Sequence, residues 1–222
     1  MKKITYILIA LSLFILAGCA SQEPTKTHDI KTIQSKMKAA KYFDVEKSII
    51  SLNNENSIKS DNGLKLTMTG KYINVVGDTF TLKADGTTIG SETQIKRWGV
   101  KLNRLAELRD ENNTVIGYIG ERRLENLFNI GYRFYMYDAQ KNEIGHTAQK
   151  WLSISDNHTI YNNNDTKAYT IKSKVPSIGS QLHIAVVDNS KIRPEYAIYF
   201  GSIVNEITSQ KRSRDATVAG MN

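Results

Sequence analysis

The sequence predicts a mainly β protein, in which a closed antiparallel β-barrel surrounds a C-terminal hydrophobic helix and an N-terminal amphipathic helix precedes the barrel. Three observations predict this fold class. Short runs of alternating apolar and polar residues extend from Leu64 to about Val187, a hairpin motif recurs within them, and an almost wholly apolar segment follows Pro194. The composition, with 40% hydrophobic and 23% charged residues among 222, is that of an ordinary globular chain and excludes a disordered or collagen-like protein.

Residues 1–18 have the pattern of a secretory signal peptide. Two lysines precede an apolar stretch from Ile4 to Leu16, which suits a signal and is too short to span a bilayer comfortably. The stretch ends in Leu16-Ala17-Gly18-Cys19, which resembles the processing box of bacterial lipoproteins. The resemblance implies cleavage before Cys19, acylation of this residue and anchoring in the cell envelope. Because Ala20 rather than an aspartate follows the cysteine, the resemblance implies the outer membrane if the cell is Gram-negative.

The mature chain divides into an anchor, one domain and a tail. Acylated Cys19 and the polar residues that follow it form a tether (19–28), residues 29–209 form a single domain, and residues 210–222 form a basic, mobile tail. The only cysteine excludes an intramolecular disulfide and a multi-cysteine metal site. The formal net charge of +8 becomes +6 when the signal peptide, with its two lysines, is removed.

The domain begins with a helical pattern from Asp29 to Phe43. Apolar residues recur there at three- and four-residue spacing, capping side chains precede them, and lysines occupy the other positions. This pattern predicts an amphipathic helix that either packs on the domain or lies on a membrane. Residues from Asn53 to Gly63 are polar and predict a loop.

A weak repeat within the β region predicts hairpins of one design. The frame Asp-x5-Ile-Gly occurs twice, 28 residues apart, and a shorter copy precedes them: Asp110 with Ile116-Gly117, Asp138 with Ile144-Gly145, and Asp85 with Ile89-Gly90. The aspartate at a strand end binds local backbone amides and starts the turn. The glycine on the returning strand marks a place where the backbone bulges or is approached closely. The three hairpins predict a meandering antiparallel sheet.

The segment Pro194–Thr208 predicts a helix, because a proline and an acid open it, and its apolar surface predicts burial on most sides. Repeated Asp-turn-Ile-Gly hairpins followed by an apolar C-terminal helix resemble the tubby-like barrel superfamily, above all its LURP-one-related and phospholipid-scramblase branches, over Leu64 to Ile207. The resemblance implies a closed barrel around the helix. Tubby-type domains bind phosphoinositides through basic surface residues, and scramblase-like members associate with membranes and are linked to lipid movement and Ca²⁺. This chain lacks a cysteine cluster and an acid-rich calcium loop, so the scramblase activity does not transfer.

The residues that carry chemistry are scattered along the chain. The four histidines have no metal-ligand spacing, and no nucleophile elbow or phosphate-binding glycine loop occurs, so we expect no catalytic residues, metal or cofactor. The alternative is an enzyme, such as a hydrolase, whose site is assembled across strands and forms no motif.

Basic residues gather around one tryptophan, and they are the predicted binding site: Lys96, Arg97, Trp98, Lys101 and Arg104. Such a group suits anionic lipid headgroups or an envelope protein partner, and the alternative is a solvated face that binds nothing. Nucleic acid would also attract this charge, but the lipoprotein box makes it an unexpected partner. The sequence therefore predicts a lipid-anchored envelope protein that binds and does not catalyse.

Overall fold

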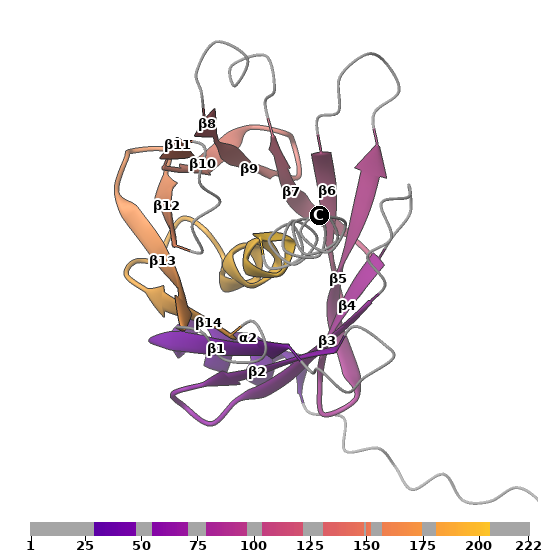
Figure 1. Cartoon of the computed structure of the whole chain (residues 1–222). Helices are drawn as coiled ribbons and strands as arrows, with labels where there is room; N and C mark the ends of the chain where they lie inside the picture. Colours follow the sequence, from indigo (N-terminus) through magenta and orange to yellow (C-terminus); the bar gives the residue numbers. More distant parts are fainter. Residues whose placement is uncertain are drawn as a thin grey trace, which may run out of the picture.

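The computed structural model describes residues 29–47, 55–70, 79–96, 104–121, 131–148, 150–151, 157–174 and 181–204. Twelve antiparallel strands form one closed barrel, and the C-terminal helix, described over residues 194–204, lies in the middle of the ring (Figure 1). The predicted fold class is therefore confirmed.

The barrel strands follow one another around the ring in chain order, and the last strand pairs with the first. Their bounds are β1 Tyr42–Lys47, β2 Glu55–Ser60, β3 Lys65–Gly70, β4 Thr79–Ala84, β5 Thr87–Lys96, β6 Arg104–Asp110, β7 Val115–Glu121, β9 Phe134–Asp138, β10 Glu143–Thr147, β12 His158–Asn162, β13 Lys167–Lys174 and β14 Gln181–Val186. Two short strands, β8 (Gly131–Tyr132) and β11 (Lys150–Trp151), form a separate two-stranded sheet.

The barrel begins earlier in the chain than the sequence predicts. The N-terminal helix, α2, spans Ile30–Ala39 and ends where Ala40 takes an extended conformation, so Phe43 lies in β1 and not in the helix. The predicted loop from Asn53 to Gly63 contains β2. This strand was missed because its two buried positions hold Asn56 and Ile58, so only one apolar residue marks it. Pairing with β1 and β3 on either side overrides its weak β pattern.

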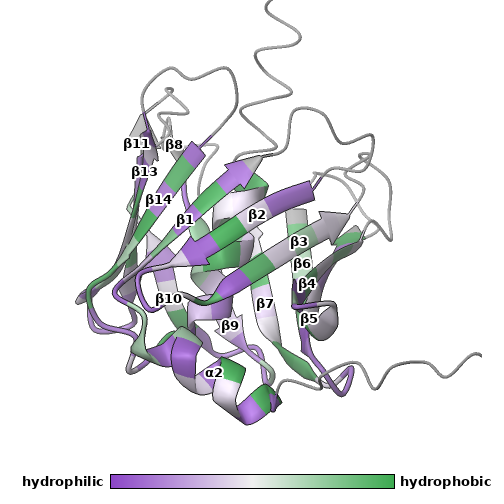
Figure 2. Cartoon of the chain, turned by 90° about the horizontal axis from the view of Figure 1, so that it is seen from below, coloured by the Kyte–Doolittle hydropathy of each residue, from purple (hydrophilic) through white to green (hydrophobic). Residues whose placement is uncertain are grey.

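Helix α2 lies across one end of the barrel, which is called the turn end here (Figure 2). Ile33 and Met37 are buried in the barrel core, so the amphipathic helix packs on the domain. The turn residue Asn62 donates a hydrogen bond to the carbonyl of Lys36 at 2.7 Å, and Gln34 donates to the carboxylate of Glu111 at 3.2 Å. These bonds join α2 to the β2–β3 and β6–β7 turns.

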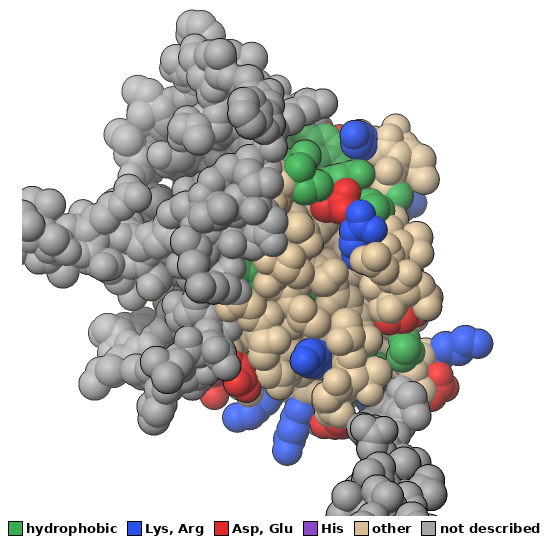
Figure 3. All heavy atoms as spheres, turned by 90° about the vertical axis from the view of Figure 1, so that its right-hand side faces the viewer, with side chains coloured by type: hydrophobic (Ala, Val, Ile, Leu, Met, Phe, Trp, Pro, Cys, Tyr) green, Lys and Arg blue, Asp and Glu red, His purple; other side chains and the backbone are tan. Residues whose placement is uncertain are grey.

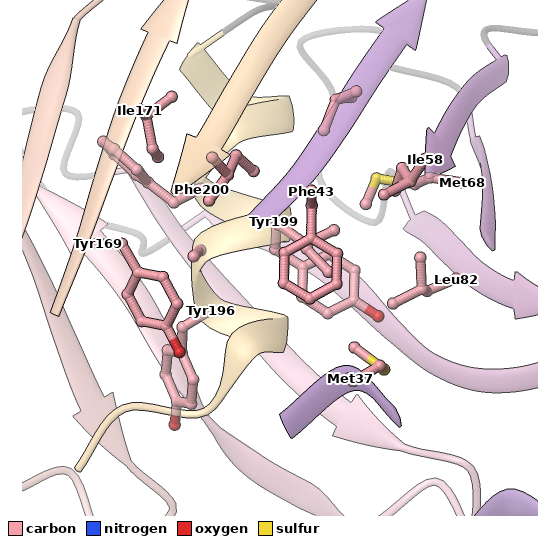
Figure 4. Packing of buried hydrophobic residues seen from close by; sticks show 14 of the residues in the cluster. Met37, Phe43, Ile58, Met68, Leu82, Tyr169, Ile171, Tyr196, Tyr199 and Phe200 are labelled. Carbon is pink, nitrogen blue, oxygen red and sulfur yellow. The ribbon is translucent and has the colours of Figure 1, made fainter. Parts of the chain in front are cut away.

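The core consists of the C-terminal helix and the inner faces of the strands. Every residue from Tyr196 to Val204 is buried, and the largest side chains among them, Tyr196, Tyr199 and Phe200, reach toward different strands (Figure 4). The ring of Phe200 meets that of Phe134 edge to face, with centroids 5.1 Å apart. A helix that is apolar all round is stable only when it is enclosed, and the ring of strands provides this enclosure.

Four hairpin turns at the turn end share one hydrogen-bond pattern. The residue at the strand end accepts a hydrogen bond from the amide three positions later and donates its own amide to the carbonyl four positions later. Its side-chain oxygen accepts from the amide four positions later. The residue three positions later has a positive φ of 58° to 80°. The four strand-end residues are Ser60, Asp110, Asp138 and Asn162.

The third predicted copy of the repeat, at Asp85, has a different turn. Asp85 and Gly86 have φ values of 45° and 83°, so they form the two central residues of a tight hairpin, and Asp85 is not the strand-end residue. The prediction of three identical hairpins is therefore wrong for this copy, and the sequence missed the turns at Ser60 and Asn162.

The Ile-Gly part of the repeat positions the central helix. In all three copies the register shifts at the isoleucine, which is the extra residue of a β-bulge, and the next position is the glycine. A Cβ atom on each glycine would meet the central segment: the Tyr199 hydroxyl for Gly90, the Tyr196 hydroxyl for Gly117 and the Ile192 side chain for Gly145. The glycines thus let the helix approach the barrel wall.

Replacing one of these glycines should separate the helix from the wall. Gly117→Ala is expected to lower the free energy of unfolding by roughly 2–3 kcal/mol, because the added methyl group overlaps the Tyr196 hydroxyl and the Tyr137 carbonyl oxygen. Urea denaturation measures the change. Thr88→Ala, at an exposed position of β5, is the control and should change stability by less than about 0.5 kcal/mol. Equal midpoints for both variants would contradict the close approach.

Candidate functional site

The predicted binding residues belong to one connection of the barrel. Lys96 and Arg104 pair in register as the last residue of β5 and the first of β6. Arg97, Trp98 and Lys101 lie between these strands in the sequence, outside the described residues. The predicted lipidation site, Cys19, also lies outside the described residues. The end of β5 and the start of β6 lie at the barrel end opposite the turn end, because the β4–β5 and β6–β7 turns are at the turn end.

The turn end carries a second set of cations, which are exposed on and beside α2. Lys31, Lys36 and Lys38 are exposed on the helix, which contains no acidic residue, and Lys41 follows it. Two acids beside the helix accept hydrogen bonds from the backbone: Asp29 from the amide of Lys31 at 3.1 Å, and Asp61 from the amide of Lys41 at 2.9 Å. Lys31, Lys36, Lys38 and Lys41 are called the turn-end lysines below.

A cleft of about 340 Å³ opens at the turn end, between α2, the β6–β7 turn and the segment before the C-terminal helix. Lys38, Lys191 and Arg193 line it together with Glu195. Arg193 donates a hydrogen bond to the nearly buried carboxylate of Glu195, at 2.5 Å. Burial alone would lower the pKa of Arg193, but this bond and the charge of Glu195 outweigh burial and raise it. Asp110 lines the cleft as well, so Lys191 and the paired Arg193 stand there beside two acids.

The outer wall of the barrel holds a cross-strand group centred on Asp44. The Nδ1 atom of His183, on β14, lies 2.8 Å from Oδ1 of Asp44, on β1, and Nζ of Lys174, on β13, lies 2.7 Å from the same oxygen. Burial raises the pKa of Asp44, but the hydrogen bonds of Lys174 and His183 outweigh it and hold the pKa below its ordinary value. An imidazole held by a carboxylate through Nδ1 is a general-base arrangement.

The barrel interior contains polar groups that the sequence analysis did not single out. Glu92, on β5, is only 1% exposed, and Asn56 and Gln94 are buried as well. Oε2 of Glu92, Oε1 of Gln94, Oδ1 of Asn56 and the hydroxyl of Tyr199 have no hydrogen-bond partner among the described residues. Burial raises the pKa of Glu92 to about 8. A carboxyl group in this position is therefore largely neutral at pH 7.

Sequence reasoning missed these groups for two different reasons. Asp44 and His183 are 139 positions apart, and only the closure of the barrel between β1 and β14 makes them neighbours. Glu92 had a local signal, because it occupies an inward position of an alternating strand next to Gly90. However, the sequence shows which positions of this strand face inward only when the bulge at Ile89 is known.

No described helix has both the length and the apolar character needed to cross a membrane. Within the same part of the chain, no group of three or more histidine, cysteine, aspartate or glutamate residues is arranged to hold a metal ion.

The buried carboxyl of Glu92 should make stability depend on pH. The unfolded chain ionises near the ordinary pKa of 4.5 and the folded protein near 8, so folding free energy is lost as the pH rises through this window. The folding free energy lost across the whole window is about 5 kcal/mol, from the difference between the two pKa values. Glu92→Gln removes the ionisation and keeps the shape. We expect it to match the wild type at pH 5 and to be several kcal/mol more stable at pH 9.

Urea denaturation at the two pH values, with N-methyl-D-glucamine as the only buffer cation, measures this difference. Glu46→Gln, on the outer face with a side chain that is 45% exposed, is the matched control and should follow the wild type at both pH values. Parallel pH profiles for Glu92→Gln and the wild type would show that the folded protein does not keep this carboxyl neutral.

No protein-family model, curated protein or solved structure matches this chain. Its function therefore has to be inferred from its own residues and their arrangement.

Proposed function

We propose that this protein is a lipid-anchored protein of the cell envelope, acylated at Cys19, whose barrel binds and does not catalyse. In a Gram-negative cell the anchor is in the outer membrane. The fold is the one that the tubby-like resemblance implies, a closed barrel around a C-terminal helix. We also propose that the chain belongs to that superfamily, while the ligand is argued from this chain's own charges.

The proposed ligand is the anionic lipid surface of the anchoring membrane. The observation that carries this proposal is the exposure of the turn-end lysines on a helix without acids, directly after the tether. The tether of ten residues (19–28) extends to at most about 35 Å, so the turn end stays close to the headgroups. Each lysine near an anionic surface contributes about 1 kcal/mol.

The barrel wall differs from the turn end in its charge. The face that carries β3 to β6 shows mostly uncharged polar groups, with basic and acidic side chains scattered among them (Figure 3). Threonines and serines occupy its outward positions, which include Thr67, Thr69, Thr81, Ser91 and Thr93. Elsewhere on the wall, Lys59 pairs with Glu46 and Lys174 with Asp44, so much of the basic charge there is compensated. Helix α2, in contrast, carries lysines and no acidic residue, so it is the surface that we propose to meet the lipid.

Neutralising the turn-end lysines should weaken lipid binding. Residues 20–222 without the acyl chains are floated with neutral and anionic vesicles at low and high salt. We expect binding only to anionic vesicles, lost at high salt because exposed charges are screened within about 8 Å at 0.15 M. The triple variant Lys31→Gln, Lys36→Gln, Lys38→Gln removes about 3 kcal/mol and should bind roughly 100-fold more weakly.

Two control variants locate the binding surface. Lys172→Gln neutralises an exposed lysine on the wall, away from the turn end, and should leave binding within about twofold of the wild type. Lys96→Gln, Arg97→Gln, Lys101→Gln neutralises the connection that the sequence analysis selected. If only this variant loses binding, the lipid surface meets the opposite end of the barrel. If the wild type does not bind vesicles at all, lipid binding is excluded and an envelope protein partner takes its place.

A second candidate function is hydrolysis, and the Asp44–His183 pair favours it. The pair matches the expectation of a site assembled across strands, and Nδ1 of His183 is already engaged by the carboxylate, which leaves Nε2 to accept a proton from water. His183→Ala should then lower hydrolysis of ester and phosphoester substrates at least 100-fold, with Lys65→Gln as the control. A wild-type protein that hydrolyses no substrate faster than buffer would eliminate this candidate.

A further inference from the structure

We propose that the inner face of β5 and Tyr199 of the C-terminal helix form an internal binding site for one small monovalent cation, an alkali ion or an ammonium group, with Glu92 as its charged ligand. The site lies inside the barrel and is distinct from the cationic turn end. It does not depend on the lipid-binding function.

Three successive inward positions of β5 line the site. Position 90 is a glycine, and a Cβ atom there would lie 3.0 Å from the hydroxyl of Tyr199. Positions 92 and 94 hold Glu92 and Gln94, which point inward because they pair in register with the buried residues Leu108 and Ala106 of β6. A hydroxyl, a carboxyl and a carboxamide thus follow one another along the strand toward the end of the barrel opposite α2.

The three groups present oxygen atoms without partners. Oε2 of Glu92, Oε1 of Gln94 and the hydroxyl oxygen of Tyr199 are buried, and no described residue donates a hydrogen bond to them. Such atoms in a protein interior are normally satisfied by protein, water or a ligand, because an unmade hydrogen bond costs about 1–3 kcal/mol per atom. Two of them on β5 and one on the facing helix indicate a bound group that the protein atoms do not supply.

The surroundings determine the charge and the size of this group. Phe80 of β4 and Leu108 and Ala106 of β6 flank the two side chains and offer no donor. The unpartnered atoms of Glu92, Gln94 and Tyr199 are all oxygens, which suits a hard cation or an N–H donor without lone pairs. One carboxylate balances one positive charge, so a divalent ion would leave an uncompensated charge in the core. Gln94 pairs with the small residue Ala106 and both are buried, so we infer an ion or ammonium group and not a large organic cation.

Cation binding exchanges for a proton on Glu92. When the site is empty, burial keeps the carboxyl neutral below about pH 8, and the incoming cation takes the place of the proton, which leaves to the solvent. The titratable group of the packed helix that the charge of Glu92 reaches is Tyr199, whose pKa is raised chiefly by burial and further by that charge. Glu195 and Arg193, at the start of the helix, act on Tyr199 with opposite signs. Affinity for the cation should therefore increase with pH up to about 8.

The test compares thermal unfolding in different chloride salts at constant ionic strength. Sodium, potassium, ammonium and methylammonium are each titrated from 1 to 100 mM against N-methyl-D-glucamine, at pH 6 and pH 9. We expect at least one small cation to raise the Tm by about 5 °C at pH 9 and by much less at pH 6. An effect of alkali ions alone identifies a metal-ion site, and an effect of ammonium and methylammonium alone identifies an amine site.

Variants tie the effect to the proposed residues. Glu92→Gln keeps the shape and the oxygen atom but removes the charge, so its Tm should not respond to any of these cations, whereas Glu46→Gln on the outer face should respond like the wild type. At pH 7, mixing the wild type with the active cation should release close to one proton per protein, and Glu92→Gln should release none. A wild-type Tm that is the same in all five cations at pH 9 would overturn the proposal and leave only water at these oxygens.

Discussion

The structure depends on one constraint, the enclosure of an apolar helix by a single ring of strands. The C-terminal helix has no polar face along its described length, so it is stable only where strands surround it on every side. Enclosure in turn requires that the backbone of the ring come close to the helix at defined places. The glycines at positions 90, 117 and 145, each directly after a β-bulge, provide these places. The bulge and glycine in these hairpins therefore determine how closely the central helix packs against the strands.

The tyrosines of the core divide the barrel into two halves. Near the turn end, Tyr196 donates a hydrogen bond to the carbonyl oxygens of Ile116 and Tyr137, and Tyr169 donates to the carbonyl oxygen of Ile192. Farther along the helix, the Tyr199 hydroxyl has no described partner, and the buried Glu92 lies in the same region. A fully bonded polar group makes a core rigid and specific, whereas an unbonded one lowers its stability. The turn half thus has a structural role, and the other half keeps polar atoms that stability alone does not explain.

The sequence predicts the fold class well, but it does not indicate groups that only the folded chain brings together, for physical reasons. Alternation, turn residues and an apolar C-terminal segment are local patterns, and they indicated the barrel and the central helix. The strand β2 was missed because an inward asparagine, Asn56, breaks its alternation. The repeat was recognised at Asp110 and Asp138, but its equivalents at Ser60 and Asn162 have other side chains that make the same bonds. The Asp44–His183 pair exists only through ring closure, so no local pattern indicates it.

The central helix is also the last part of the domain to be synthesised. Until residues 194–204 have emerged, the ring has no core, and every inward side chain that the helix covers is exposed to water. Closure between β1 and β14 also joins the two ends of the domain, so its native contacts are strongly non-local. A partially made chain therefore cannot fold strand by strand into a stable intermediate. If the chain is exported unfolded, folding is therefore delayed until the C-terminal helix has been made. A truncated chain lacks the core that would protect it from proteases.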